Sequence, residues 1–250
     1  MQLSDLLPAV GELIPYDYET IRTPEYETLL AGLLAGAVSQ TAPHFVQIGG
    51  IPGAGKTTFC KNSHWDERLF ISFDKIMESL PAYRQDIYRL GAVRAFNRWE
   101  MPARIIGYEA LRRAVEKKAD IWLEHSGVNN PHIELIKNLK KKGYTTEMYF
   151  ILCNLDIACR RAELREKITR RHTSREMIVK RNELVKTYLE QYKTLVDNLY
   201  IYDTSTTNSP CKQLSKGHSN SLNAIFSFFV ICTIFSVAYL PRRHILSPET

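Results

Sequence analysis

The chain has 250 residues, 44% of them hydrophobic and 24% charged, which is enough for one folded domain with a sizeable core. Its five cysteines are odd in number and lack metal-ligand spacing, which argues against a disulfide framework and against a zinc site. No charged region followed by an apolar core opens the sequence, so we expect no secretory signal. These features favour a folded protein with free thiols in a reducing compartment.

The first 42 residues are acidic and have a helical pattern. Residues 1–40 carry six acidic side chains against a single basic one, Arg22. Apolar residues recur there at helical spacing: Leu29, Leu30, Leu33, Leu34 and Val38. We therefore expect residues 1–42 to be a helical lead-in that covers one face of a domain spanning residues 43–205. The alternative is an acidic segment that folds over a basic site or is covered by a partner.

A glycine-rich stretch follows the apolar run 45–48 and matches the phosphate-binding loop pattern G-x-x-x-x-G-K-[ST] at each fixed position. Glycines allow backbone conformations in which successive N–H groups point at phosphate oxygens, and the next helix turns its positive N-terminus toward the same anion. Lys56 supplies a mobile charge for the outer phosphates, and the Thr57 hydroxyl suits a magnesium ion. The predicted nucleotide-binding residues are Gly50, Ile51, Pro52, Gly53, Ala54, Gly55, Lys56, Thr57 and Thr58.

Polar side chains follow two further predicted strands. The strand at 69–73 ends in Asp74. The strand at 120–123 is followed by Glu124, His125 and Ser126. Because ligands of open α/β sheets bind outside the carboxyl ends of the strands, we expect these groups beside the phosphate loop. Asp74 is thus a candidate general base, with the cap of the next helix as the alternative role.

A long helical block separates these two strands. Residues 76–118 have a helical pattern that Pro81 and Pro102 are expected to interrupt. Glu109 lies near the middle of the last predicted helix, where spacing alone gives it no role beyond that of an exposed charge.

A basic segment follows the fourth predicted strand. Residues 153–181 carry nine Lys and Arg against four Asp and Glu. A helix is expected to begin near Ser174, which places Arg165, Arg170 and Arg171 on a helix end and a loop, a geometry suited to a lid that closes over phosphates. The surplus of positive charge beside a phosphate site indicates phosphate handling before nucleic-acid binding, and a solvated face is the competing explanation for each single arginine.

The composition changes toward the end of the chain. Residues 206–221 are rich in Ser, Thr, Asn, Gly and Lys and are predicted to be a linker. The hydrophobic tail 222–250 begins with an uncharged run, 222–240, which is long enough to span a bilayer. Three interpretations are open: an anchor that tethers a cytoplasmic protein to the inner face of the membrane, a packed helix, or an end altered by a change of reading frame.

The succession of strands and helices predicts an α/β fold. The strands at 45–48, 69–73, 120–123, 145–152 and 199–202 alternate with helical segments, as in a parallel sheet of the P-loop NTPase type with helices on both faces. The hydrophobic tail adds a predicted C-terminal helix.

With these residues in place, the stretch 45–205 resembles the zeta-toxin family of P-loop kinases. Residues 49–57 reproduce the loop Gly-Gly-x-Pro-Gly-x-Gly-Lys-Thr of that family. Asp74 resembles the aspartate that acts there as base, and Glu109 a substrate-side glutamate. Arg165 and Arg171 resemble its lid arginines. The family's Glu-Gly-Thr is similar to Glu124-His125-Ser126, with histidine in place of glycine and serine in place of threonine.

The resemblance implies that ATP, with Mg²⁺, phosphorylates a hydroxyl of UDP-N-acetylglucosamine, and that the enzyme is a toxin restrained by an antitoxin. It implies catalytic roles for Lys56, Asp74, Arg165 and Arg171, and Thr57 as the metal ligand. The acceptor-binding residues that it implies are Asp74, Glu109, Glu124 and Ser126.

Two alternatives to this function stay open. One is a kinase of another small molecule or of a polynucleotide 5′-hydroxyl, although the basic stretch holds no aromatic ring apart from His172, which argues against a nucleic-acid channel. The other is a nucleotide-binding module without catalytic activity.

Overall fold

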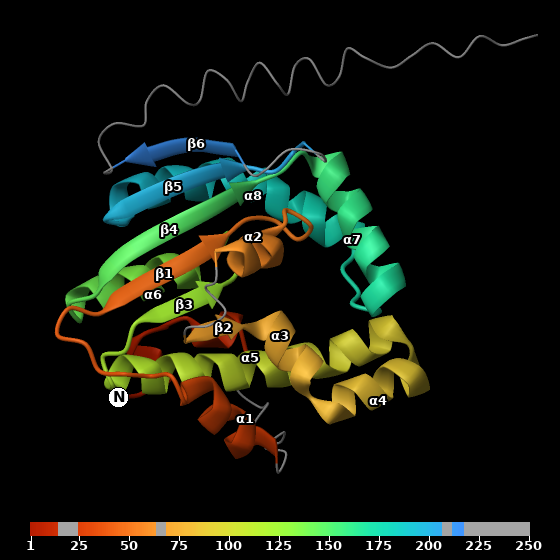
Figure 1. Ribbon diagram of the computed structural model, residues 1–250, viewed down its shortest axis with the longest axis horizontal. Helices are drawn as coiled ribbons and strands as arrows, with labels where there is room; N and C mark the ends of the chain where they lie inside the picture. Colours follow the sequence, from red (N-terminus) through yellow and green to blue (C-terminus); the bar gives the residue numbers. More distant parts are fainter. Residues whose placement is uncertain (15–24, 64–68, 207–211, 218–250) are drawn as a thin grey trace, which may run out of the picture.

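The computed structural model describes residues 1–14, 25–63, 69–206 and 212–217. Its centre is a six-stranded sheet of order β2-β3-β1-β4-β5-β6 (Figure 1). The strands are β1 (His44–Gly49), β2 (Phe70–Ser72), β3 (Ile121–Glu124), β4 (Thr145–Leu152), β5 (Asn198–Asp203) and β6 (Lys212–Gly217). The first five are parallel, with β1 between β3 and β4. This arrangement confirms the predicted α/β sheet of the P-loop type.

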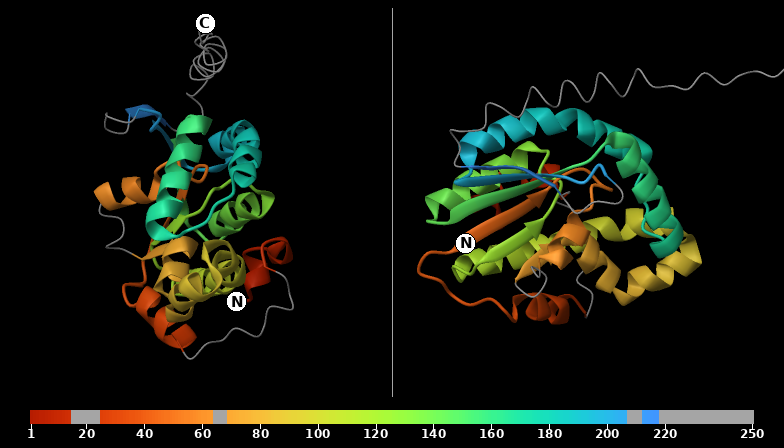
Figure 2. Two further views of the ribbon diagram at one scale, coloured as in Figure 1. Left: turned by 90° about the vertical axis from the view of Figure 1, so that its right-hand side faces the viewer. Right: turned by 45° about the horizontal axis from the view of Figure 1, so that its top comes forward.

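Helices cover both faces of the sheet, as predicted. They are α1 (Glu25–Leu34), α2 (Lys56–Asn62), α3 (Phe73–Ser79), α4 (Pro81–Leu90), α5 (Ala92–Glu116), α6 (Asn130–Lys141), α7 (Leu155–Thr169) and α8 (Arg175–Leu195). Successive side chains of a strand point to opposite faces, so Ile121 and Leu123 pack in the core that includes α5, α6 and α8. Trp122 packs with α2 and α7 on the other face. Figure 2 shows these helices on either side of the sheet.

The strand β6 is a correction to the predicted linker 206–221. It pairs antiparallel with β5, from Leu199 opposite Gly217 to Asp203 opposite Lys212. The polar composition that predicts a linker is compatible with an edge strand, because the backbone supplies the pairing hydrogen bonds whatever the side chains. The hydrophobic stretch 222–240 lies outside the described residues. Of the helices that the structure describes, none is long and apolar enough to cross a membrane.

Helix α5 runs without interruption through Pro102, where the sequence analysis expects a break. A proline inside a helix costs roughly 3 kcal/mol, because it removes a hydrogen bond and crowds the preceding turn. The helix buries a long stripe that includes Trp99, Ile106 and Leu111, and burial of each such side chain contributes roughly 1.5–3 kcal/mol. Packing therefore outweighs the local preference. Pro81, in contrast, interrupts the helical block as predicted, since α3 ends at Ser79 and α4 begins at Pro81.

The N-terminal segment packs against the domain, but only part of it is helical. Two short 3-10 turns, η1 (Leu3–Asp5) and η2 (Val10–Glu12), precede α1. Leu6 and Leu7 are fully buried, whereas Val38 of the predicted apolar stripe is 65% exposed. Asn138 on α6 donates a hydrogen bond of 3.2 Å to the carbonyl oxygen of Leu6. The segment is thus part of the hydrophobic core.

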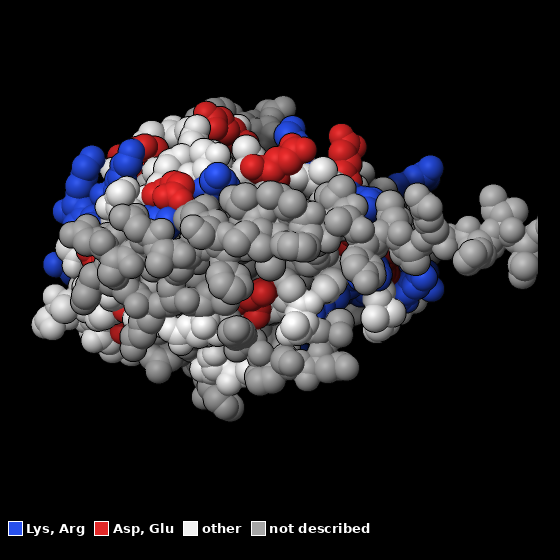
Figure 3. All heavy atoms as spheres, turned by 90° about the horizontal axis from the view of Figure 1, so that it is seen from above, with Lys and Arg blue, Asp and Glu red and all other residues white. Residues whose placement is uncertain are grey.

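The carboxyl ends of the central strands point toward two groups of helices. In Figure 1, α3 and α4 lie on one side of these strand ends and α7 on the other. On the face shown in Figure 3, acidic and basic side chains of the described residues are interspersed.

Shortening Leu7 to alanine is expected to lower the free energy of unfolding by roughly 2–5 kcal/mol, because the variant leaves a cavity in the core. Chemical denaturation of the full chain measures this change. Leu164→Ala is the matched control, since Leu164 is 58% exposed on α7. Equal stability of the two variants would contradict the packing of the N-terminal segment into the core.

Candidate active site

The predicted phosphate-binding loop lies between β1 and α2, and its backbone requires glycine. Gly53 has a φ of +82°, in the left-handed region that side chains disfavour. A Cβ atom at this position would stand 2.1 Å from the carbonyl oxygen of Ala158 on α7. Gly55, with a φ of +88°, precedes the first residue of α2. The loop is therefore pressed against α7, and its amide groups are held at the N-terminus of a helix, where an anion is favoured.

Lys56 is held over this loop. Its Nζ atom donates hydrogen bonds to the carbonyl oxygens of Gly50 at 2.9 Å and of Ile51 at 3.1 Å. Burial lowers the pKa of Lys56 to about 8, against the opposing charges of Glu124 and Asp74, which favour its protonated form. The ammonium group thus lies beside the loop, and it loses its proton at a pH not far above neutral.

Glu124 lies against the loop threonine. Its buried carboxylate, at the end of β3, accepts a hydrogen bond of 2.8 Å from the Thr57 hydroxyl and one of 3.0 Å from the Ser72 hydroxyl. The sheet fixes this arrangement, because Glu124 is in register with Ser72 on β2 and with Ile48 on β1. A hydroxyl and a carboxylate in contact are the hard oxygen donors that Mg²⁺ prefers. The family resemblance implies that Glu124 binds the acceptor, whereas the contacts of its carboxylate lie on the side of the phosphate loop.

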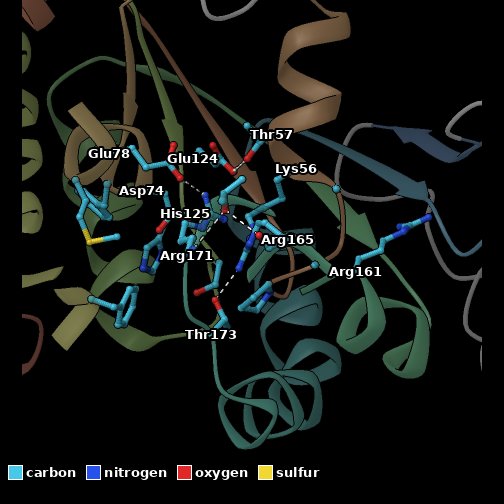
Figure 4. Close-up of a pocket in the computed structure, with 18 of the residues that line it drawn as sticks. Lys56, Thr57, Asp74, Glu78, Glu124, His125, Arg161, Arg165, Arg171 and Thr173 are labelled. Atoms are coloured by element: carbon cyan, nitrogen blue, oxygen red, sulfur yellow. Dashed lines mark hydrogen bonds and ion pairs between the residues drawn. The ribbon is translucent and has the colours of Figure 1, made fainter. Parts of the chain in front are cut away.

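Asp74 is paired with an arginine of the basic segment. It lies in the first turn of α3, so it is inside the helix and not its cap. Arg171, between α7 and α8, contacts the Asp74 carboxylate at 3.1 Å and the Glu78 carboxylate at 3.3 Å (Figure 4). Burial opposes the charge of Arg171, but Asp74 and Glu78 outweigh it and raise the pKa of the guanidinium. The structure thus brings Asp74 and Arg171 together in one pocket.

Arg165 is the second predicted lid arginine in this pocket. It extends from α7 and donates a hydrogen bond of 2.6 Å from Nη2 to the Thr173 hydroxyl. Its Nε atom is buried and has no hydrogen-bond partner among the described residues. Burial and the neighbouring charge of Arg171 lower the pKa of Arg165. A buried guanidinium with an unused donor is a suitable contact for an anionic ligand.

These side chains surround a cavity of about 560 Å³. Lys56, Thr57, Asp74, Arg165 and Arg171 line it together, as do Pro52, Gly53, Gly55, Thr58, Glu124 and Ser126 from the predicted set. Figure 4 shows Lys56, Arg165 and Arg171 pointing toward one another in its centre. The pocket combines a phosphate cradle, guanidinium groups and a carboxylate, which is the chemistry that phosphoryl transfer requires.

Four predicted site residues do not line this pocket: Gly50, Ile51 and Ala54, which belong to the backbone of the phosphate loop, and Glu109, which lies away from the loop. The Glu109 carboxylate binds Arg112 at 2.7 and 2.8 Å and Arg113 at 2.8 Å, and the hydrogen bond from Arg112 is the main reason that the pKa of Glu109 is lowered. The acid of α5 that lines the pocket is Glu100. The two are nine residues apart on an unbroken helix, which is about two and a half turns, so they lie on opposite faces.

The pocket also contains residues that the sequence analysis does not assign: Glu78, Glu100, Arg104, Arg161 and Arg181. On α5, a signal is present in the i, i+4 spacing of Phe96, Glu100 and Arg104, which places them on one face. Arg161 donates a hydrogen bond of 2.9 Å to the carbonyl oxygen of Thr204. The Thr204 hydroxyl in turn donates a hydrogen bond of 2.7 Å to the carbonyl oxygen of Ala54 in the phosphate loop. Arg161 therefore ties the end of the sheet to the phosphate loop.

His125 forms part of the pocket wall with a second histidine behind it. The imidazole rings of His125 and His132 stack at 3.8 Å. Burial lowers the pKa of both, that of His132 to about 3, so both are neutral at pH 7. The backbone N–H of Gly127 donates to Nδ1 of His125 at 3.2 Å, which leaves the ring hydrogen on Nε2. His125 thus contributes a neutral donor.

The lowered pKa of Lys56 predicts proton uptake on nucleotide binding. At pH 8.5 most Lys56 side chains are neutral in the free protein, and bound phosphates favour the charged form. Calorimetric titration with ATP in buffers of different ionisation enthalpy is expected to show an uptake of about half a proton or more at pH 8.5 and little at pH 6.5. The same uptake in Lys56→Met would contradict this assignment.

Comparisons with known proteins identify relatives of this chain. The sequence profile of the family described as Zeta toxin matches residues 30–210. Among curated proteins, no sequence matches significantly.

Solved structures share the fold. One, from the PezAT chromosomal toxin–antitoxin system of Streptococcus pneumoniae, has a TM-score of 0.57 at 17% identity and covers 85% of this chain and 92% of its own. AvrRxo1-ORF1:AvrRxo1-ORF2 with sulphate ions also has a TM-score of 0.57, at 12% identity, covering 89% and 73%. Its complex with ATP has a TM-score of 0.53 at 11% identity, covering 89% and 74%. With more than half of its length matched by the family profile and a kinase pocket at the strand ends, the chain belongs to the Zeta toxin family and is an ATP-dependent phosphotransferase.

Proposed function

We propose that this kinase transfers the γ-phosphate of ATP to a hydroxyl of a nucleotide sugar, with UDP-N-acetylglucosamine as the first candidate, and that it acts as a toxin. The observation that carries the proposal is the contact between Asp74 and Arg171 in the pocket that also holds Lys56. A carboxylate and guanidinium groups beside a phosphate cradle are the parts needed for transfer to an alcohol.

The nucleotide is bound by the phosphate loop in this proposal. The backbone N–H groups around Gly53 and Gly55 and the N-terminus of α2 bind the phosphates, with Lys56 placed on the outer ones. Arg165 and Arg171 approach from the opposite side, from α7 and the loop after it. Their charges stabilise the transferring group, whose negative charge spreads over its outer oxygens.

A magnesium ion fits the same side of the pocket. The test is the donor set: the Thr57 hydroxyl and the Glu124 carboxylate are in hydrogen-bond contact, and Ser72 orients the other oxygen of the carboxylate. We infer that Thr57 and Glu124 would hold Mg²⁺. The ion would supply charge neutralisation at the β- and γ-phosphates.

Asp74 is the proposed general base. As the acceptor oxygen forms its bond to the γ-phosphorus, the bond from that phosphorus to the bridging oxygen breaks, ADP leaves and the hydroxyl proton passes to Asp74. Arg171 pairs with the Asp74 and Glu78 carboxylates, and the transferring group would be a further anionic partner. When Arg171 moves to the phosphate, Asp74 is released to accept the proton.

A protein partner is also proposed. Relatives in fold are described as part of the PezAT toxin–antitoxin system and as an AvrRxo1-ORF1:AvrRxo1-ORF2 complex. By that likeness, an antitoxin would restrain this chain.

The acceptor can be tested with labelled ATP and a panel of nucleotide sugars, free sugars and a 5′-hydroxyl oligonucleotide. The proposal expects a phosphomonoester of a nucleotide sugar and one ADP for each product molecule. A phosphorylated oligonucleotide, with no labelled sugar, would contradict the acceptor class while leaving the kinase intact.

Replacing Asp74 by asparagine is expected to reduce kcat by about 10²–10⁴-fold with little change in ATP affinity, because the variant lacks the base but keeps the shape. Steady-state kinetics with the acceptor from the panel measure this change. Glu78→Gln is the matched control, because it removes the other carboxylate on Arg171. If both variants lose activity equally, Asp74 acts by positioning Arg171 and not as the base.

Substituting Glu124 by glutamine is expected to raise the Mg²⁺ concentration needed for half-maximal ATP turnover by about tenfold or more, because a charged ligand partner is lost. Glu134→Gln is the control, since Glu134 lies on α6 and pairs with Lys137 at the surface. An unchanged Mg²⁺ dependence in Glu124→Gln would place the ion elsewhere.

A further inference from the structure

The pocket extends to residues that have no role in the proposed transfer step. We call this part the α5–α8 lobe and define it by six side chains from α5, α8 and the turn after β3: Phe96, Glu100, Arg104, His125, Met177 and Arg181. The sequence analysis assigns none of them a function, and His125 is a departure from the family pattern. The lobe combines apolar surface with charge.

Arg181 carries a charge that no carboxylate contacts in the described part of the chain. It extends from α8 into the pocket, and no hydrogen bond or ion pair joins it to a described residue. Burial and the charge of Arg104 lower the pKa of Arg181, against the opposing charges of Glu100 and Asp74, which do not contact it; a guanidinium keeps its proton at neutral pH. Partly buried charge without a partner is costly, and a ligand anion would compensate it.

Arg104 is a second guanidinium in the lobe, and it is already held in place. It pairs with the carboxylate of Glu100, one helical turn earlier, and donates a hydrogen bond of 3.3 Å to the carbonyl oxygen of Leu13. The packed N-terminal segment therefore fixes the direction of Arg104. Because Glu100 balances the charge of Arg104, the positive charge that remains in the lobe is that of Arg181.

The remaining polar group of the lobe is also a donor. His125 is neutral, since its burial lowers its pKa, and its Nδ1 atom accepts from Gly127, so Nε2 carries the hydrogen. The lobe thus offers guanidinium groups and an imidazole N–H against one carboxylate that is already paired. Phosphate oxygens, which only accept hydrogen bonds, match this set.

In the proposed function, the phosphates of ATP are bound by the phosphate loop, Lys56, Arg165 and Arg171. We propose that Arg181, supported by Arg104, binds a phosphate or diphosphate group of the acceptor and so makes the enzyme specific for anionic acceptors. This inference rests on the proposed kinase function and deepens it. Phe96 and Met177 would then contact apolar parts of the same molecule.

A binding experiment on the full chain tests the site without requiring transfer. The phosphate loop is first saturated with Mg²⁺ and a non-hydrolysable ATP analogue, and inorganic pyrophosphate is then titrated calorimetrically. One equivalent is expected to bind, and Arg181→Gln is expected to weaken it by about tenfold or more, with Arg181→Lys in between. Lys180→Gln is the matched control, because this exposed lysine is the next cation on α8 and does not line the pocket.

The affinity of each variant for the ATP analogue shows whether it is folded. Absence of a pyrophosphate site in the loaded wild type, or equal affinity of wild type and Arg181→Gln, would overturn the inference. Arg181→Gln and Arg181→Lys could also lose affinity for the ATP analogue while their pyrophosphate binding stays unchanged. That result would assign Arg181 to the nucleotide and would overturn the inference.

Kinetics separate this inference from the proposed acceptor. With UDP-N-acetylglucosamine, Arg181→Gln is expected to raise KM by about tenfold or more and to change kcat little. A lowered kcat with the same KM would mean that Arg181 acts on the transferred group, which overturns the inference. If pyrophosphate binding depends on Arg181 but no nucleotide sugar is phosphorylated, the anion site stands and the nucleotide sugar is wrong.

Discussion

The ion pair between Arg171 and Asp74 joins the two sides of the pocket. Arg171 comes from the segment between α7 and α8, and Asp74 from the first turn of α3. Each is a group that phosphoryl transfer would need for a different purpose, the guanidinium for the transferring group and the carboxylate for the acceptor proton. Because an arginine stays protonated, it can exchange one anionic partner for another without moving a proton. In the proposed mechanism, this contact would couple arrival of the nucleotide to release of Asp74 as the base.

The fold explains why so much charge can be gathered in one place. The parallel order of β2, β3 and β1 brings Ser72, Glu124 and the phosphate loop to one edge of the sheet. Carboxylates there compensate part of the positive charge of the basic segment, because Asp74 and Glu78 both pair with Arg171. Arg165 and Arg181 keep unused donors or charge, and both line the cavity. The uncompensated charge thus lies where an anionic ligand would enter.

Features set by short-range chemistry are predictable from the sequence. The phosphate loop depends on glycines at fixed spacing, and the five parallel strands on apolar runs, so both could be identified. Features set by tertiary packing could not be predicted from the sequence. Pro102 is tolerated because α5 buries a long apolar stripe, and β6 pairs through its backbone. The unbroken α5 then turns Glu109 away from the pocket and Glu100 toward it; the i, i+4 spacing places Glu100 on one face with Phe96 and Arg104 but does not say which face meets the pocket. Arg181 is one of nine basic residues in its segment, and only the tertiary structure distinguishes it from exposed neighbours such as Lys180.

A structure of the complex with Mg²⁺, ADP and aluminium fluoride would test the central claim most directly, since the metal fluoride stands in for the phosphoryl group in transfer. The exchange of partners by Arg171 predicts that its guanidinium contacts the fluorides, together with Lys56 and Arg165, and that the Asp74 carboxylate faces the position of the attacking oxygen. An Arg171 that stays on Asp74 and Glu78, with the fluoride bound by Lys56 alone, would contradict it.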